Sequence, residues 1–213
     1  MRPNKIRLLF LLFIAIIPCG LVAQNTKFRI DDWEKRINKR QPPVMVLDAV
    51  GFKPGMIVGE VGAGTGRMTL WIADRISDSG KIYANDINTG NLEQLRTKAK
   101  ESGFTNIEII TGDTRDPKLP KGKLDVAFMI NVYHHLDDQQ AMLKNILPSL
   151  KPGAYLAIVE CDPDIVEWGD SEGCTSKKDM EAELKQAGFE LIRTDDILDE
   201  DNIYIARPLI LKK

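Results

Sequence analysis

Short apolar runs alternate with amphipathic stretches along the chain after residue 24, and turn residues separate them. The runs MIVGEV, LDVAFMI and AYLAIV are apolar almost throughout, which is typical of strands buried on both faces of a sheet. We expect strands over residues 56–61, 81–86, 107–111, 124–130, 154–160, 189–195 and 202–208. The amphipathic stretches predict helices over residues 43–50, 66–76, 89–102, 137–150 and 176–187.

The order of these elements predicts the fold class. Strands that alternate with helices imply a parallel sheet, because each crossover helix packs back onto a face of the sheet. Only a turn at residues 198–201 can join the last two strands, so these two must run antiparallel. The predicted fold is α/β, a doubly wound and mostly parallel seven-stranded sheet with a C-terminal antiparallel hairpin and helices on both faces.

The first 23 residues have a different pattern. Arg2, Lys5 and Arg7 precede an uninterrupted apolar run over residues 8–17, and the segment ends at the small residue Ala23. This is the layout of a signal peptide, and it predicts an exported protein, periplasmic or secreted, after cleavage behind Ala23. The run is shorter than the roughly 20 residues that a membrane span needs, so we expect no stable span in the mature chain.

Two observations leave the location open. Cys19 would be the acylated residue of a lipoprotein, although Pro18 is a poor residue in front of a modified cysteine. Six basic residues also follow the apolar run closely, and basic residues on that side disfavour translocation. They are Lys27, Arg29, Lys35, Arg36, Lys39 and Arg40. A membrane-anchored or cytoplasmic protein is therefore the alternative.

Residues 24–52 predict a helical cap. Between residues 26 and 40, four large apolar side chains lie among charges, which favours an amphipathic helix that packs over the domain or over its cleft. They are Phe28, Ile30, Trp33 and Ile37.

Composition narrows the class of partner. With 213 residues, 43% of them apolar and 28% charged, the chain predicts one compact domain and excludes a disordered or multi-pass membrane protein. The formal net charge is -2, with Lys and Arg scattered, so we expect no nucleic-acid partner. Cys161 and Cys174 either pair or remain ordinary thiols, and neither has a CxxC or CxxH spacing, so we expect no metal site.

A glycine loop follows the first predicted strand. Glu60 is followed by three alternating glycines, Gly62, Gly64 and Gly66. Glycine is needed where the backbone turns tightly or where a ligand approaches the main chain. A dinucleotide fingerprint would have Gly or Ala at the position of Arg67, and a phosphate-binding P-loop would end in Gly-Lys-Ser/Thr. Neither class fits this spacing, which disfavours an NAD-dependent oxidoreductase.

The pattern acid-x-Gly-x-Gly-x-Gly resembles motif I of class I S-adenosylmethionine-dependent methyltransferases, and the resemblance extends, segment by segment, from about Lys53 to Pro208. It implies that residues 53–213 form a methyltransferase domain with S-adenosyl-L-methionine as cofactor. An acid near the loop favours a ligand that carries an ammonium and a sulfonium, and the helix N-terminus near Gly66 favours its carboxylate. The implied cofactor-binding residues of the loop are Glu60, Gly62, Ala63, Gly64 and Gly66.

Two further acids follow strands. Asp86 closes the second strand, where a carboxylate can accept hydrogen bonds from both hydroxyls of a ribose, and Ile87 follows it in the expected site. The alternative for Asp86 is the N-cap of the next helix. The resemblance implies that Asp113 reaches the adenine amino group and that Thr114 flanks the base, while a plain turn is the alternative there.

Both histidines of the chain follow the fourth strand. Ligands of doubly wound sheets lie beyond the carboxyl ends of the strands, so Asn131 and Tyr133 are expected to line the pocket, with Asn131 in the cofactor site. His134 is our candidate catalytic residue, because a histidine can accept a proton at neutral pH. A catalytic His135, or a purely structural role for the pair, stays open.

These observations predict a methyltransferase that acts on a small-molecule acceptor. Methyl transfer from a sulfonium needs positioning and neither a metal nor a covalent intermediate, so the missing catalytic triad is no objection. A protein methyltransferase is one alternative. A non-catalytic S-adenosylmethionine-binding module in the cell envelope is another, since the expected export would separate an enzyme from a cytosolic donor.

Overall fold

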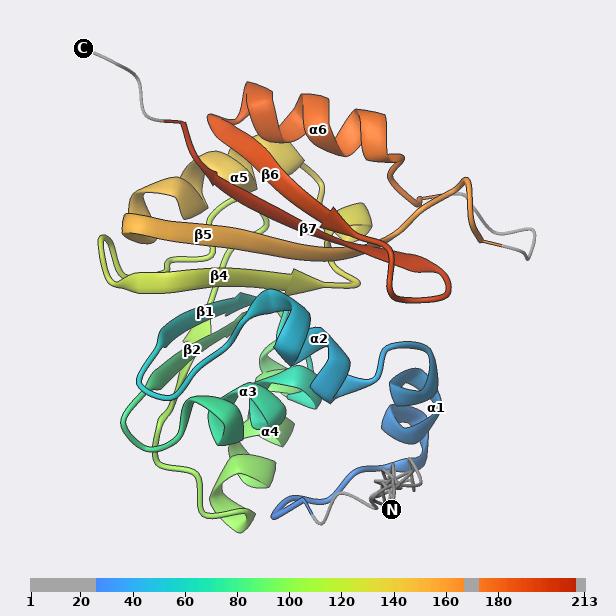
Figure 1. The fold of residues 1–213 in the computed structure, drawn as a ribbon. Coiled ribbons are helices and arrows are strands. Elements are labelled where there is room, and N and C mark those ends of the chain that lie inside the picture. The colour runs from blue at the N-terminus through green and yellow to red at the C-terminus, as the bar shows by residue number, and fades with distance from the viewer. Residues whose placement is uncertain (1–25, 167–172, 210–213) are drawn as a thin grey trace, which may run out of the picture.

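The computed structural model describes residues 26–166 and 173–209, so the expected leader lies outside the described residues. Seven strands form one sheet in the order β3-β2-β1-β4-β5-β7-β6 (Figure 1). The strands are β1 (Ile57–Val61), β2 (Lys81–Asp86), β3 (Ile107–Thr111), β4 (Leu124–Ile130), β5 (Leu150–Cys161), β6 (Phe189–Asp195) and β7 (Asp201–Pro208). The helices are α1 (Asp32–Arg40), α2 (Pro43–Val50), α3 (Arg67–Ile76), α4 (Thr89–Glu101), α5 (Gln139–Ile146) and α6 (Lys177–Gln186), with 3-10 turns η1 (Tyr133–His135) and η2 (Leu147–Ser149).

The direction of the strands confirms the predicted fold. Strands β1 to β5 pair in parallel, and β7 pairs antiparallel with both β5 and β6. The chain moves outward from β1 to β3 and then returns to place β4 on the other side of β1. The strand order therefore reverses between β1 and β4, and ligands of such sheets lie in the crevice beyond the carboxyl ends at this point.

Helices cover both faces of the sheet and enclose two apolar cores. Successive side chains of β4 alternate between them: Val126 and Phe128 lie in one, and Ala127 and Met129 lie in the other. Helices α2, α3 and α4 contribute to the first core, and α5 and α6 contribute to the second (Figure 1). Within the described ranges, no helix has the length and apolar character required to cross a membrane.

The N-terminal helix is shorter than the amphipathic stretch predicted over residues 26–40. Helix α1 begins at Asp32, because Asp31 and Glu34 form a capping box in which each side chain accepts a hydrogen bond from the other's backbone N–H. The predicted apolar face was wrong for Trp33, which is 51% exposed. Glu34 is buried instead, where it accepts a hydrogen bond of 2.9 Å from Lys98 of α4.

The helix predicted over residues 137–150 was too long at both ends. Asp138 caps α5 by accepting a 2.9 Å hydrogen bond from the backbone N–H of Ala141. The α-helix ends before Pro148, which has no N–H to continue the ladder. Strand β5 then begins at Leu150, four positions before the predicted start at residue 154.

Candidate functional site

The glycine loop between β1 and α3 has a backbone that side chains would obstruct. Gly62, Gly64 and Gly66 all have positive φ angles, of 74°, 55° and 94°. A Cβ at Gly62 would collide with the side chain of Val132, and one at Gly66 would collide with Leu95. A Cβ at Gly64 would meet nothing within 4 Å. The loop is therefore packed tightly at its two ends and open beside its central glycine.

Asp86 connects two loops at the carboxyl end of β2. Its Oδ2 atom accepts a hydrogen bond of 2.8 Å from the backbone N–H of Gly64, and its Oδ1 atom accepts one of 2.8 Å from Asn88. Asn88, and not Asp86, is the N-cap of α4, since its side chain accepts from the N–H of Asn91. Each oxygen of Asp86 keeps acceptor capacity for a further donor, as a carboxylate offers about four lone pairs.

A cavity of about 310 Å³ lies beside these residues, at the point where the strand order reverses. Its lining is Val61, Gly62, Asn85, Asp86, Ile87, Asp113, Thr114, Asn131, Val132, His135, Leu136, Asp137 and Met142. Six of the eleven residues named as site residues from sequence are in this lining: Gly62, Asp86, Ile87, Asp113, Thr114 and Asn131. The other five lie outside the lining: Glu60, Ala63, Gly64, Gly66 and His134. The expectation that Tyr133 lines the pocket was wrong, because this side chain is buried and its hydroxyl donates to Glu183.

The lining fits a nucleoside that carries a sulfonium. Asp86 offers two oxygens to a sugar diol, and Ile87 presents an apolar side chain that is 58% exposed. Asp113 offers a carboxylate beyond them, although its N–H also donates to Asp116 in the turn that was the alternative reading. Among the described residues that line the cavity, none is Lys or Arg, which suits a cationic ligand better than a phosphate.

Glu60 supports the loop from beneath. It is fully buried and accepts a hydrogen bond of 2.6 Å from the hydroxyl of Thr69 on α3. Burial raises the pKa of the Glu60 carboxyl from 4.5 to about 7, against the opposing effects of Thr69 and Arg67. The structure thus links Glu60 to α3, the helix after the loop, whereas the sequence suggested that this acid faces the ligand.

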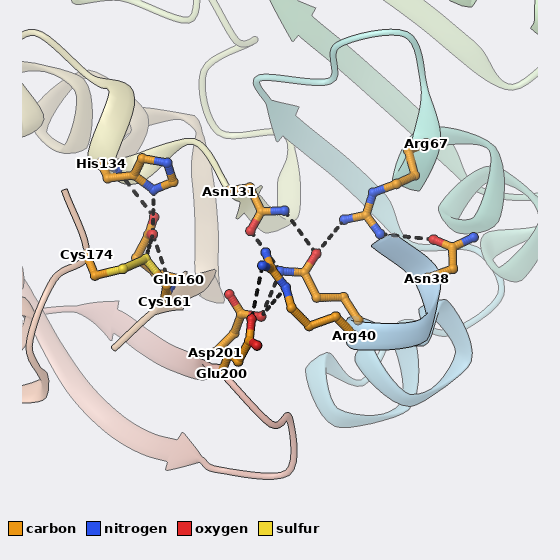
Figure 2. A network of polar contacts seen from close by, with 11 residues as sticks. Asn38, Arg40, Arg67, Asn131, His134, Glu160, Cys161, Cys174, Glu200 and Asp201 are labelled. Atoms are coloured by element: carbon orange, nitrogen blue, oxygen red, sulfur yellow. Dashed lines mark hydrogen bonds and ion pairs between the residues drawn. A yellow bond between two sulfur atoms is a disulfide. The ribbon is translucent and has the colours of Figure 1, made fainter. Parts of the chain in front are cut away.

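Arg67 is also buried, and burial lowers its pKa to about 10. Its guanidinium donates to the side-chain oxygens of Gln41, at 2.8 Å, and of Asn38, at 3.1 Å. Figure 2 shows that Asn38 and Arg67 approach each other from the N-terminal segment and from α3. Arg67 therefore joins the end of the glycine loop to residues at the C-terminal end of α1.

Gln41 is the residue that sequence reasoning missed. Its side-chain N–H groups donate to Asn131, at 2.7 Å, and to Asp201, at 2.9 Å. Its oxygen accepts from Arg67, at 2.8 Å, and from Asn131, at 3.0 Å. All four hydrogen-bonding positions of this fully buried amide are occupied. Nothing in the local sequence marks it, because its partners come from three distant segments.

The two histidines face different surroundings. His135 lines the cavity, whereas His134 turns its Nδ1 atom to Glu160, at 2.5 Å (Figure 2). The hydrogen bond to Glu160 raises the pKa of His134. Burial, followed by the charge of His134, lowers the pKa of His135, whose ring centroid lies 3.9 Å from that of His134. His135 is therefore the histidine that stays neutral at pH 7 beside the cavity.

The sequence of residues 58–153 matches the family model described as a methyltransferase domain. Together with the fold and the cavity, this match supports a domain of the class I S-adenosylmethionine-dependent methyltransferase type, with S-adenosylmethionine as its cofactor. A crystal structure of a SAM-dependent methyltransferase from Aquifex aeolicus is similar, with a TM-score of 0.74 and 25% identity, over 84% of this chain and 98% of that chain.

The curated relatives match over a shorter part of the chain. The ubiquinone/menaquinone biosynthesis C-methyltransferase UbiE of Vibrio parahaemolyticus is 25% identical over 122 residues, which are 57% of this chain and 47% of the relative. The protein of the same name from Shewanella baltica is 27% identical over 115 residues, 54% of this chain and 46% of the relative. The match thus spans about half the length of these relatives.

Proposed function

We propose that the protein transfers the methyl group of S-adenosylmethionine to a small-molecule acceptor. The observation that carries this proposal is that Gly62 and Asp86 line the same cavity of about 310 Å³ as the loop that follows β4. Donor and acceptor can then be held together away from water, which is the main requirement of this reaction. The volume is of the size that small-molecule sites have.

A carbon acceptor is part of this proposal. The relatives named C-methyltransferase support it, and they act, by their names, in quinone biosynthesis. The cofactor supplies a methyl group bound to a positively charged sulfur. Asp86 and Asp113 are proposed to hold the nucleoside. Asn131 is proposed to form part of the opposite wall of the cavity. A carbon acid must lose a proton when it is methylated, so the site also needs a proton acceptor.

We assign His135, in preference to His134, as the acceptor of this proton. His135 lines the cavity and its pKa is lowered by burial, whereas Nδ1 of His134 is already hydrogen-bonded to Glu160. In a His135→Gln variant, we expect kcat to fall by about 100-fold, within the range typical of general-base loss, with an unchanged affinity for S-adenosylhomocysteine. An unchanged kcat would remove His135 from the mechanism.

Two measurements test the function itself. Calorimetry with S-adenosylhomocysteine tests the cofactor site, and the absence of any binding would refute the proposal. Label transfer from methyl-labelled S-adenosylmethionine then tests the acceptor, with a cell extract divided into small molecules and proteins. Label in the small-molecule fraction is the expected result. Label in protein would indicate a protein methyltransferase, and binding without transfer would indicate a non-catalytic module.

We also propose that the protein is exported after cleavage behind Ala23. The leader pattern supports this location, and so does the disulfide between Cys161 and Cys174, since disulfides persist in oxidising compartments. Alkaline phosphatase fused after Thr26 should be active in intact cells. An inactive fusion would contradict export and favour a cytoplasmic enzyme.

A further inference from the structure

Four groups of the kinds that bind metals meet at the carboxyl end of β5. Nδ1 of His134, a carboxylate oxygen of Glu160 and Sγ of Cys161 lie within 4.8 Å of one another. Cys174 is disulfide-bonded to Cys161 and so brings a second sulfur to the same place. Figure 2 shows these four side chains together, away from the hydrogen bonds between Asn38 and Arg67. The chain thus gathers one nitrogen, one oxygen and two sulfur atoms, the ligand types of zinc sites.

The carboxylate of this cluster is fully buried and already oriented. Oε1 of Glu160 accepts a hydrogen bond of 3.0 Å from the backbone N–H of Cys161, and Oε2 accepts one of 3.3 Å from that of His134. Backbone donors of this kind hold a ligating carboxylate in place and stay available when the carboxylate binds an ion. The side chain of His134 is 20% exposed, which gives an ion a route to the cluster.

The distances approach those of a tetrahedral zinc site once one covalent bond and one hydrogen bond are broken. Zinc bonds of about 2.3 Å to sulfur and about 2.0 to 2.1 Å to nitrogen or oxygen require a sulfur-to-oxygen distance of about 3.6 Å and a nitrogen-to-oxygen distance of about 3.3 Å. Oε1 of Glu160 lies 3.4 Å from Sγ of Cys161, close to the required value, and 2.5 Å from Nδ1 of His134, a distance that must lengthen by about 0.8 Å when an ion replaces this hydrogen bond. The two sulfurs, bonded to each other in the disulfide, must separate to about 3.8 Å.

Contacts other than the disulfide keep Cys174 at the cluster. The backbone N–H of Thr175 donates a hydrogen bond of 3.2 Å to the carbonyl oxygen of Cys161. A Cβ built at Gly173 would lie 3.9 Å from the Cβ of His134, so the chain passes directly beside that histidine. When the sulfur–sulfur bond is absent, Sγ of Cys174 can therefore reach a ligand position by a movement of its side chain alone.

We propose that reduction of the Cys161–Cys174 disulfide opens a Zn²⁺ site made by His134, Glu160 and the two cysteines. A dithiol supplies the two electrons: its own two sulfurs join in a disulfide, the Cys161–Cys174 bond breaks, and each cysteine takes up one proton. Zinc binding then releases both thiol protons, and a third one when the His134 ring is protonated. In the disulfide form the sulfurs carry no negative charge, so the site binds zinc only when reduced.

Metal binding to the full chain tests the proposal directly. Co²⁺ is the probe, because thiolate ligands give it a charge-transfer band and Zn²⁺ should displace it. A phosphine reductant adds no competing thiol. We expect reduced protein to bind one Co²⁺ per chain and the disulfide form to bind at least about 100-fold more weakly. Cys174→Ser should abolish the band that two thiolates produce.

Matched substitutions locate the site. His134→Gln and Glu160→Gln should each weaken Zn²⁺ binding by at least about 100-fold, since even residues behind a ligand cost 10-fold to 100-fold. The controls are the neighbouring ring, in His135→Gln, and an exposed carboxylate of the same loop, in Asp164→Asn. Both controls should stay within about threefold of the wild type.

One measurement needs no substitution and so does not depend on a variant that folds. One equivalent of Zn²⁺ should slow the alkylation of both cysteines in reduced wild-type protein by at least about tenfold. The proposal is overturned if Zn²⁺ leaves alkylation unchanged, or if reduced protein binds Co²⁺ no better than the disulfide form. Binding that survives both His134→Gln and Glu160→Gln would show a thiol site without these ligands and would also overturn it.

Discussion

Removal of the Asp86 carboxylate should separate cofactor binding from folding. In Asp86→Ala, the backbone N–H groups of Gly64 and Asn88 lose their acceptor, and so does any sugar diol in the cavity. The N–H groups of Gly64 and Asn88 are at the rim of the site, where water can replace the carboxylate as their acceptor. We therefore expect a modest loss of stability, about 1 to 2 kcal/mol, in urea unfolding.

The loss of ligand affinity should be larger. A hydrogen bond to a charged group contributes about 1.5 to 3 kcal/mol, and two ribose hydroxyls would each form one with Asp86. At the lower figure, Asp86→Ala loses about 3 kcal/mol of binding free energy, which is a rise of roughly 150-fold in the Kd of S-adenosylhomocysteine. Asp86→Asn keeps one acceptor oxygen, so its Kd for S-adenosylhomocysteine should lie between that of the wild type and that of Asp86→Ala.

Isothermal titration calorimetry with S-adenosylhomocysteine measures this change, and circular dichroism confirms that each variant is folded. Asp78→Ala is the matched control, because it removes an exposed carboxylate that precedes the opposite end of β2. Its Kd should equal that of the wild type. If folded Asp86→Ala binds within about twofold of the wild type, the carboxylate does not contact the sugar and the proposed orientation of the nucleoside is wrong.

Three further changes test the architecture of the site. Gly62→Ala places a Cβ against Val132 at a φ of 74°, so unfolding in urea should show a loss of about 2 to 4 kcal/mol; a loss below 0.5 kcal/mol would contradict the packing. The raised pKa of Glu60 means that the folded protein keeps a proton that the unfolded chain releases above about pH 4.5. Stability relative to Glu60→Gln should therefore fall by about 3 kcal/mol from pH 4.5 to about 7 and then stay level, as urea titrations across this range would reveal; a constant difference would refute it. Gln41→Ala leaves buried partners of the amide, Asn131 among them, unpaired, so urea unfolding should show a loss of about 2 to 4 kcal/mol, and an unchanged midpoint would be the contrary result.

Residues whose structure depends on near neighbours were predictable. The boundaries of β2, β3, β4 and β6 agree with the predicted ones, because a glycine lies within two positions of one end of each strand: Gly80, Gly112, Gly122 and Gly188. The pairing of β6 with β7 followed from the short turn between them. The errors at helix starts came from local caps. Because Asp138 caps α5 and Asp31 caps α1, each of these helices begins later in the chain than predicted.

The site was predictable only where a motif is local. Gly62 and Asp86 come from a loop and a strand end that have a recognisable spacing, and both line the cavity. Gln41 was missed, and so was the pairing of Glu160 with His134, since both roles arise from partners far along the chain. The separation of His135 from His134 was also beyond the sequence, because the two rings are adjacent in the chain and only the η1 turn directs them to different surroundings.

The hydrogen bond between Gln41 and Asp201 joins positions that are 160 residues apart in the chain. Arg40 adds a contact of 3.1 Å with Glu200, which directly precedes β7. Loss of β7 would therefore leave one N–H of the buried Gln41 amide without its acceptor. Because the same amide is hydrogen-bonded to Asn131 in the cavity lining, a truncation at the C-terminal end of the chain would disturb a contact of the cavity wall.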